Sequence, residues 1–445
     1  MFNRKLSTLA AVAFLSILPV IASASTGRLA GMALPGDYTA DYTSIYAWPS
    51  SITGLGNLVY GEFGSVDNYS WGDTPSDMSM GAVLPNLWEG RFGVWALHLR
   101  QTTNGLASGT AASTSNGDPN TNGNQSFDLG WGIKMGKHAF GLQLNRSYNS
   151  LEDELPGTTW TFKQNNAQNE NTGTGAGNLS RNIMGVGAGF GAEMSEKMTV
   201  EGALMWQTRS FENGHNGAAS FKNSDDGGSN YLLALRAMHK CTPNLTMVPV
   251  AKYYSFDLSN KQESAGNPTV TRQNTVKGWQ VGAAGNWTIG SNDLFVLGAT
   301  VSQNKLDQQE NLFGVTNQAN GYSNGAGAFS DTLTATESGF PTVFMALETQ
   351  VNGWLTLRFG ANKGVMHTLK IEGHNGAGGT AQSETITIHD SPFSMATGAG
   401  VKLGSLKFDA VLTTGFYNDP FSTLTTGDNS NYGSPFTKVS ATYNW

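Results

Sequence analysis

The sequence predicts an all-β fold: a transmembrane antiparallel β-barrel of about 16 strands with a short N-terminal plug segment. Apolar and polar side chains alternate along segments of roughly ten residues. Very short polar turns alternate with long loops rich in Asn, Gly, Ser and Thr. No apolar run is long enough to cross a bilayer as a helix, whereas a closed barrel satisfies its backbone groups in lipid through hydrogen bonds between strands.

Alternation is clearest near the end of the chain, in residues 355–362, 406–413 and 438–445. In a strand, successive side chains point to opposite faces, whereas a helix would mix the two sets on every face. The last segment places Val439, Ala441, Tyr443 and Trp445 on one face and Lys438, Ser440, Thr442 and Asn444 on the other. We expect the first of these two faces to contact lipid.

The strand count follows from the short turns, which we place on the periplasmic side. These turns are residues 85–90, 136–138, 195–197, 241–244, 290–293, 352–353 and 404–405. One strand precedes them, at 57–63, and one follows, at 435–445, so the seven turns predict sixteen strands. Fourteen strands is the alternative, because alternation is weakest in the first hairpin. Long loops are expected at 65–76, 103–124, 148–180, 210–228, 257–276, 303–338, 366–388 and 417–434.

The chain divides into three parts, of which residues 1–24 are expected to be a cleavable signal peptide. Arg4 and Lys5 precede an apolar stretch at 6–21, and small residues follow at 22–24. The alternative, a membrane anchor, is disfavoured because the apolar stretch is short. Residues 25–56 form a separate N-terminal segment, and residues 57–445 form the barrel. A single Cys241 excludes an intramolecular disulfide framework.

Residues 25–56 are expected to fold inside the barrel lumen. Tyr38, Tyr42 and Trp48 are among the side chains that make this segment too apolar for a disordered tail. The predicted lumen face carries glycines at 130, 132, 185, 187, 189, 398 and 400. Glycines leave room for close packing, although they also relieve strand curvature. A plug is therefore favoured over a periplasmic tail.

The same segment resembles a known family. Arg28, Gly31 and Met32 form a first element, Asp41 lies in a second, and Pro49 and Leu55 match part of a third. These residues resemble the N-terminal segment of the FadL/TodX-type outer-membrane hydrocarbon transporters and their PorV-like relatives. Ala33 departs from a family glycine and Trp48 from a family asparagine. The resemblance implies a plug that contains Arg28, Gly31, Met32, Asp41, Trp48 and Pro49.

The resemblance also implies a location and partners. It places the exported chain in the outer membrane of a Gram-negative bacterium, in contact with outer-membrane lipid. In this class, the outer-membrane assembly machinery recognises a C-terminal strand that ends in an aromatic residue, here Trp445. An interface aromatic that merely ends the chain would look the same.

Charged residues on the predicted lumen face are of both signs. The candidate lumen residues are Arg100, Asp128, Lys134, Glu201, Arg236, Lys252, Glu348, Arg358, Lys402, Lys407, Asp409 and Lys438. Alternation supports their inward direction but leaves two roles open. They either line a polar channel and set its selectivity, or hold the plug through ion pairs.

Catalytic, metal and nucleic-acid motifs are lacking, so we expect neither an enzyme nor a cofactor. There is no Gly-x-Ser-x-Gly elbow and no His-Glu-x-x-His helix. The neighbours His389, Asp390 and Ser391 would point to alternate faces of a strand and cannot form a relay. Residues 118–123 resemble the start of a calcium loop, but Leu129 occupies the position of the bidentate Glu. The net charge is −7, without a basic cluster for nucleic acid.

Passive passage of a small-molecule solute is the leading functional hypothesis. The resemblance favours a hydrophobic solute, held by loop aromatics at positions 160, 162, 211, 221, 313, 322 and 329. The alternatives are a water-filled porin for polar solutes, and a non-conducting structural or surface-binding barrel.

Overall fold

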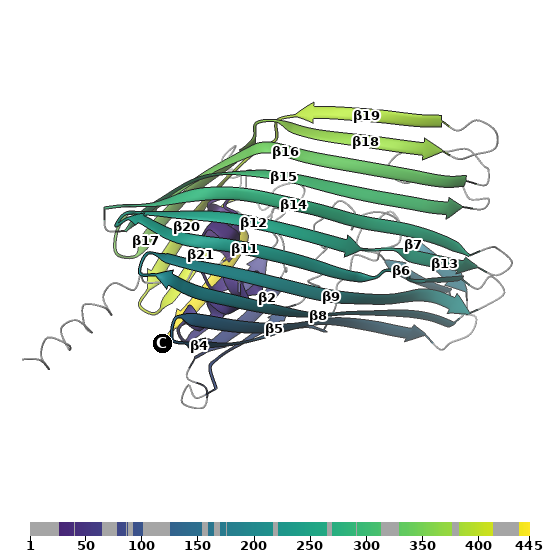
Figure 1. The fold of residues 1–445 in the computed structure, drawn as a ribbon. Coiled ribbons are helices and arrows are strands. Elements are labelled where there is room, and N and C mark those ends of the chain that lie inside the picture. Colours follow the sequence, from purple (N-terminus) through teal and green to yellow (C-terminus); the bar gives the residue numbers. More distant parts are fainter. Residues whose placement is uncertain are drawn as a thin grey trace, which may run out of the picture.

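A computed structural model shows a closed barrel around a helical N-terminal segment (Figure 1). It describes residues 26–39, 41–64, 78–85, 87, 92–100, 125–153, 159–163, 170–174, 176–216, 221–264, 269–290, 292–312, 329–375, 382–412 and 436–445. The expected signal peptide lies outside these residues. So do the side chains of the predicted loop aromatics, apart from the buried Phe211.

The N-terminal segment contains four short helices, and the rest is strand. The helices are α2 (Thr26–Gly31), η1 (Gly36–Tyr38), η2 (Tyr42–Tyr46) and η3 (Pro49–Gly54). The strands are β1 (Leu58–Gly64), β2 (Met78–Leu84), β3 (Val94–Arg100), β4 (Gln125–Met135), β5 (His138–Asp153), β6 (Thr159–Lys163), β7 (Glu170–Thr174), β8 (Ala176–Ser195), β9 (Met198–Asn216), β10 (Phe221–Asp225), β11 (Ser229–Thr242), β12 (Leu245–Asp257), β13 (Asn260–Ser264), β14 (Val270–Ile289), β15 (Asp293–Leu312), β16 (Phe329–Gln350), β17 (Leu355–Gly364), β18 (His367–Asn375), β19 (Gln382–Asp390), β20 (Phe393–Leu403), β21 (Leu406–Leu412) and β22 (Phe436–Asn444).

Sixteen antiparallel strands close the barrel, which confirms the predicted fold and strand count. They are β1–β5, β8, β9, β11, β12, β14–β17 and β20–β22. Strand β1 pairs with β22 along its whole length, from Leu58 opposite Asn444 to Gly64 opposite Lys438, and this pairing leaves no edge in the ring. Glycines with positive φ form three of the predicted short turns, at Gly136, Gly290 and Gly404.

On one side of the barrel, the strands extend farther beyond the lipid belt than the sequence predicted (Figure 1). Residues 270–276 and 303–312, expected in loops, belong to the long strands β14 and β15. Residues 367–375 and 382–388, also expected in a loop, belong to β18 and β19. These extensions alternate over short stretches at most, such as Leu369 and Ile371 on β18, because beyond the lipid neither face of a sheet needs to be apolar. The predicted loop boundaries are therefore wrong on this side.

Three neighbouring strands are interrupted at one height. β16 bends at Phe340–Pro341, β17 gives way to β18 at Val365–Met366, and β19 gives way to β20 at Ser391–Pro392. Pro341 and Pro392 lack the N–H that a ladder hydrogen bond requires, which is consistent with an interruption at two of these three points. The register between β15 and β16 shifts here, between Thr300 and Ser302. Even-numbered residues of β16 face the lumen below the break and the outside above it.

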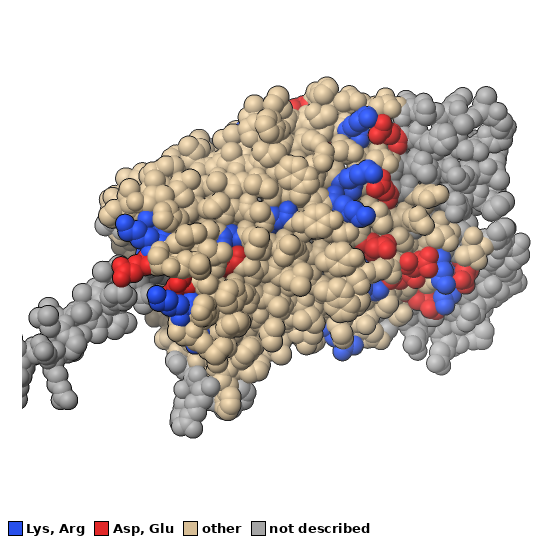
Figure 2. Space-filling model, in the orientation of Figure 1, with Lys and Arg blue, Asp and Glu red and all other residues tan. Residues whose placement is uncertain are grey.

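A broad outward-facing apolar belt surrounds the barrel. It includes Leu97, Leu99, Leu142, Leu144, Val186, Phe190, Leu204, Leu235, Val281, Leu297, Met345, Leu347 and Phe359, all exposed in the isolated chain. Figure 2 shows that Lys, Arg, Asp and Glu leave most of this middle zone free and gather toward the two ends. Such a belt is the lipid-facing surface of a transmembrane barrel.

No helix in the described part of the chain combines the length and the apolar character needed to span a bilayer.

The last strand has the faces that its sequence predicted. Lys438, Ser440 and Thr442 are buried, whereas Tyr443 and Trp445 are exposed and stack at a centroid distance of 6.0 Å. Recognition of Trp445 by the assembly machinery stays a prediction.

Candidate functional site: the plugged lumen

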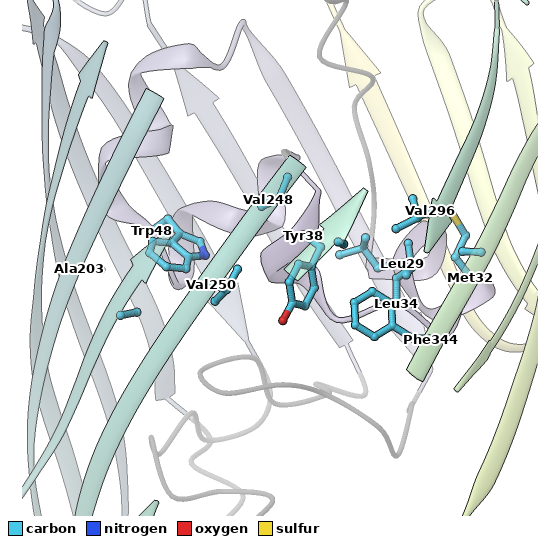
Figure 3. Close-up of a cluster of buried hydrophobic side chains, with 13 residues drawn as sticks. Leu29, Met32, Leu34, Tyr38, Trp48, Ala203, Val248, Val250, Val296 and Phe344 are labelled. Atoms are coloured by element: carbon cyan, nitrogen blue, oxygen red, sulfur yellow. The ribbon is translucent and has the colours of Figure 1, made fainter. Parts of the chain in front are cut away.

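The N-terminal segment fills the lumen and supplies much of the buried core. Leu29, Met32, Tyr38, Trp48 and Ile52 are each no more than 1% exposed. Figure 3 shows the first four of them facing wall residues that include Ala203, Val248, Val250, Val296 and Phe344. The Tyr38 and Phe344 rings lie 4.8 Å apart. We refer to residues 26–55 as the plug.

Capping residues in the sequence fix the starts of two short helices of the plug. Asp41 caps η2, because its Oδ1 accepts hydrogen bonds from the amides of Thr43 (2.8 Å) and Ser44 (3.1 Å). The Ser44 hydroxyl in turn accepts one from the Asp41 amide at 3.0 Å, which completes a capping box. Pro49 begins η3, where its missing N–H costs nothing.

Glycines of the wall allow the plug to pack directly against the backbone. A Cβ at Gly360 would overlap the Met32 carbonyl, and one at Gly141 would overlap the Pro49 carbonyl. A Cβ at Gly189 would lie 2.6 Å from the Ser50 amide nitrogen. Among the glycines named from the sequence, 130, 132, 189 and 398 meet the plug in this way. In contrast, 185 and 187 meet wall side chains, and 400 meets Arg358 and Asp409.

The first ionic contact fixes α2 to three strands. Glu348 on β16 accepts hydrogen bonds from Arg28 Nε (2.6 Å) and Nη2 (2.7 Å), and from Arg358 Nε on β17 (2.6 Å). Arg358 also lies 2.9 Å from Asp409 on β21, and Lys407 lies 3.5 Å from the same carboxylate. Arg358 and Asp409 are fully buried. This chain of alternating charges compensates each buried ion, which burial would otherwise strongly disfavour.

A second contact holds η1 and the start of η3. Lys252 Nζ lies 2.6 Å from Asp37 Oδ2, and the Trp48 indole N–H donates to Asp37 Oδ1 at 3.3 Å. Arg236 pairs with Glu201 at 2.5 Å while its guanidinium lies 4.5 Å from the centre of the Trp48 ring. Ser51 donates to the same Glu201 carboxylate at 2.9 Å.

A third contact joins η2 to the first strands. The Tyr42 hydroxyl donates to Glu62 at 2.8 Å, and Lys438 lies 3.7 Å from Glu62. The Tyr46 hydroxyl is hydrogen-bonded to that of Tyr60, and the Tyr46 ring lies 4.9 Å from His98. His98 and Arg100 both contact Asp128, at 3.1 Å and 2.6 Å. The plug is thus fixed around much of the lumen wall.

Most of the candidate lumen residues meet at the plug. Nine are buried, namely Arg100, Asp128, Glu201, Arg236, Lys252, Glu348, Arg358, Asp409 and Lys438. Lys407 is partly exposed, while Lys134 pairs with Glu193 at 2.6 Å and, like Lys402, lies exposed beside a periplasmic turn. Sequence reasoning missed Asp37, although an acid next to Tyr38 in so apolar a segment was a signal for a buried partner.

Asp41 of the plug is a titratable group outside the membrane-spanning strands, and the packing of the plug should therefore depend on pH. Burial raises the pKa of Asp41 to about 6, against the opposing hydrogen bond from Thr43 and the charge of Arg28. A carboxyl with a raised pKa stabilises the packed state at pH values below its ordinary pKa, and this contribution is lost as the pH rises through about 6. We expect hydrogen exchange at η2, corrected for intrinsic rates, to show weaker protection at about pH 7 than at about pH 4. Asp41→Asn keeps the capping oxygen and should remove the difference; an unchanged difference in this variant would contradict the assignment.

An apolar cluster lies on the lumen face just extracellular to the plug. On β12, Val250 and Lys252 contact the plug, whereas the next residues on the same face, Tyr254 and Phe256, stack with ring centroids 5.1 Å apart. The cluster consists of Met205, Leu232, Tyr254, Phe256, Leu258 and Val276, with Leu306 packed against it. These residues come from five neighbouring wall strands and the segment after β12. We call them the apolar lumen cluster.

The comparisons with known proteins find similar solved structures. No family model and no curated protein matches this sequence. The chain is similar to the toluene transporter TbuX of Ralstonia pickettii, with 10% identity, a TM-score of 0.36, and coverage of 96% of this chain and 98% of that one. It is similar to the toluene transporter TodX of Pseudomonas putida, at 9%, 0.36, and 95% and 98%. It is also similar to a FadL homologue of Pseudomonas aeruginosa, at 10%, 0.37, and 95% and 98%. These proteins belong to the group that residues 25–56 resemble.

Proposed function

We propose that this protein is an outer-membrane channel, exported through a cleaved signal peptide, for passive uptake of small hydrophobic solutes. The observation that carries the proposal is the change of lumen chemistry along single strands. On β12 the lumen face passes from Lys252, which is paired with plug Asp37, to Tyr254 and Phe256, two and four residues farther along the strand. A lumen filled by a plug, with an apolar stretch of wall next to it, supports passage of an apolar solute over a polar one.

The buried charges support a plugged transporter over an open porin. A water-filled pore keeps its charged side chains hydrated, because burying them without partners is costly. Here Glu348 and Asp37 reach plug or wall cations at 2.6 Å, and the charges are used to hold the plug. Apolar solutes gain roughly 25 cal/mol for each Å² of surface that leaves water, so the apolar lumen cluster favours them over sugars.

Reconstitution distinguishes the two kinds of channel. We expect purified protein in planar bilayers to show no steady ionic current, and proteoliposomes to exclude sugars. Cells that carry the protein should take up a monoaromatic hydrocarbon such as toluene faster than cells without it, whereas loss of residues 26–55 should give a steady current. Free sugar permeation by the intact protein would overturn the proposal in favour of the porin.

The apolar lumen cluster yields a residue-level prediction. Phe256→Ser removes a buried ring from the lumen face and should lower cellular uptake of the hydrocarbon about tenfold or more, because an aromatic side chain buries 150–250 Å² or so. Initial uptake rates at equal surface expression provide the measurement. Tyr253→Ser is the matched control, since Tyr253 is on the same strand but faces lipid. Equal loss in both variants would show that the lumen face has no special role.

A further inference from the structure

A row of cationic and hydroxyl side chains crosses the outward face of the tall side of the barrel. The register places Ser255, Lys277, Lys305, Thr336 and Lys370 directly opposite one another on the successive strands β12, β14, β15, β16 and β18. Thr387 on β19 continues the row. No carboxylate is part of it. We call Lys277, Lys305 and Lys370 the lysine row.

The lysine row faces outward and is accessible. The Lys305 side chain is 53% exposed and that of Lys370 is 45% exposed. Lys277 is also exposed, and it lies on the same face of β14 as the lipid-facing Val281. Figure 2 shows Lys and Arg atoms beside acidic atoms where the uncharged belt ends on this side.

The part of the row on β12 and β14 lies just beyond outward-facing aromatic residues. Two residues toward the periplasm, the register aligns Tyr253 on β12 and Trp279 on β14 with Leu233 on the neighbouring β11, all exposed on the outward face. Exposed aromatic residues at this position mark the boundary between hydrocarbon and headgroups. Two residues of strand span about 7 Å, so the Lys277 ammonium group lies near the level of the lipid headgroups, and Lys305 and Lys370 continue the row from there.

The charges of the row are only partly compensated within the chain. Lys277 and Lys305 are directly opposite, and like charges in this relation destabilise a strand pair. Lys305 lies 2.9 Å from Asp307 and Lys370 lies 2.7 Å from Glu372, each two residues farther from the membrane. In the described part of the chain Lys277 has no carboxylate partner. An anion held between Lys277 and Lys305 would remove their repulsion.

We propose that the lysine row binds the phosphate groups of a phosphorylated glycolipid, lipopolysaccharide, in the outer leaflet. Lysine ammonium and hydroxyl groups are good phosphate ligands, and anionic headgroups attract lysines placed at their level. The row spans three strand spacings from Lys277 to Lys370, about 14 Å, which suits a headgroup with two separated phosphates better than a phospholipid with one. The inference rests on the proposed outer-membrane location but not on transport.

Binding of lipid A to the purified protein tests this directly. Detergent-solubilised protein is titrated with diphosphorylated lipid A, with enzymatically dephosphorylated lipid A, with phosphatidylglycerol and with inorganic phosphate, and complexes are counted by native mass spectrometry. The triple variant K277Q/K305Q/K370Q should bind diphosphorylated lipid A about a hundredfold more weakly, since each lysine near a lipid surface contributes about fivefold. The Lys→Arg triple variant should bind like the wild type.

A matched control separates this site from general charge. K137Q/K197Q/K240Q removes three exposed lysines next to the periplasmic turns and should leave binding unchanged. The proposal is overturned if the control loses as much affinity as the test variant, or if the test variant loses none. Equal binding of dephosphorylated lipid A, phosphatidylglycerol or inorganic phosphate would also overturn it. These measurements involve no transport, so their failure is distinct from failure of the channel proposal.

Discussion

Replacing Glu348 by alanine is expected to detach α2 from the barrel wall and to convert a silent barrel into a conducting one. Glu348 is the carboxylate that joins Arg28 of the plug to Arg358 of the wall, with N–O distances of 2.6 Å to each. Its loss leaves two guanidinium groups close together, with Arg28 buried and deprived of this partner. Breaking a buried ion pair from one side costs roughly 3–5 kcal/mol, enough to shift a packed segment to its released state.

The measurement is single-channel current in planar bilayers, with thermal unfolding of the barrel followed in parallel. Asp225→Ala is the matched control, because Asp225 also pairs with a buried arginine, Arg209 at 2.9 Å, in the extracellular extension and without plug contact. The control should lose stability without gaining current. If Glu348→Ala stays as silent as the control, the ion pair does not hold the plug closed.

The sequence contained enough information for the barrel because lipid imposes alternation on every strand that crosses it. Lys438, Ser440 and Thr442 turned inward and Tyr443 outward as expected, and the short turns gave the strand count. The same physics explains the failure at β14, β15, β18 and β19. Above the lipid neither face of a sheet has to be apolar, so the alternation is too short to separate these strands from loops.

The lumen contacts were only half predictable. Alternation correctly turned Glu348, Arg358 and Asp409 inward, but it carries no information on which charges meet. Arg28 and Glu348 are 320 positions apart and touch only because the closed ring folds around the plug. Break positions such as Phe340–Pro341 also escape alternation, since the face of every residue beyond them depends on the partner strands. The lysine row could therefore be identified only from the register.

Gly360→Ala is expected to displace the plug by a route that leaves every charge in place. The added Cβ would overlap the Met32 carbonyl, which is a backbone group and cannot rotate away. Met32, which directly follows α2, is completely buried, so the chain at the end of α2 cannot shift locally without losing its packing. We expect a steady current in planar bilayers, together with faster hydrogen exchange throughout residues 26–34.

Gly353→Ala is the control for Gly360→Ala. A Cβ at Gly353, in the turn before the same strand, would meet nothing within 4 Å. That variant should remain silent and exchange like the wild type. Gly360→Ala and Glu348→Ala disturb the same region of the plug, the first through a steric overlap and the second through the loss of an ion pair. If both variants conduct with the same unit current, they share one released state of the plug. Conduction by Glu348→Ala with silence of Gly360→Ala would instead show that charge on the wall, and not the position of α2, controls the passage.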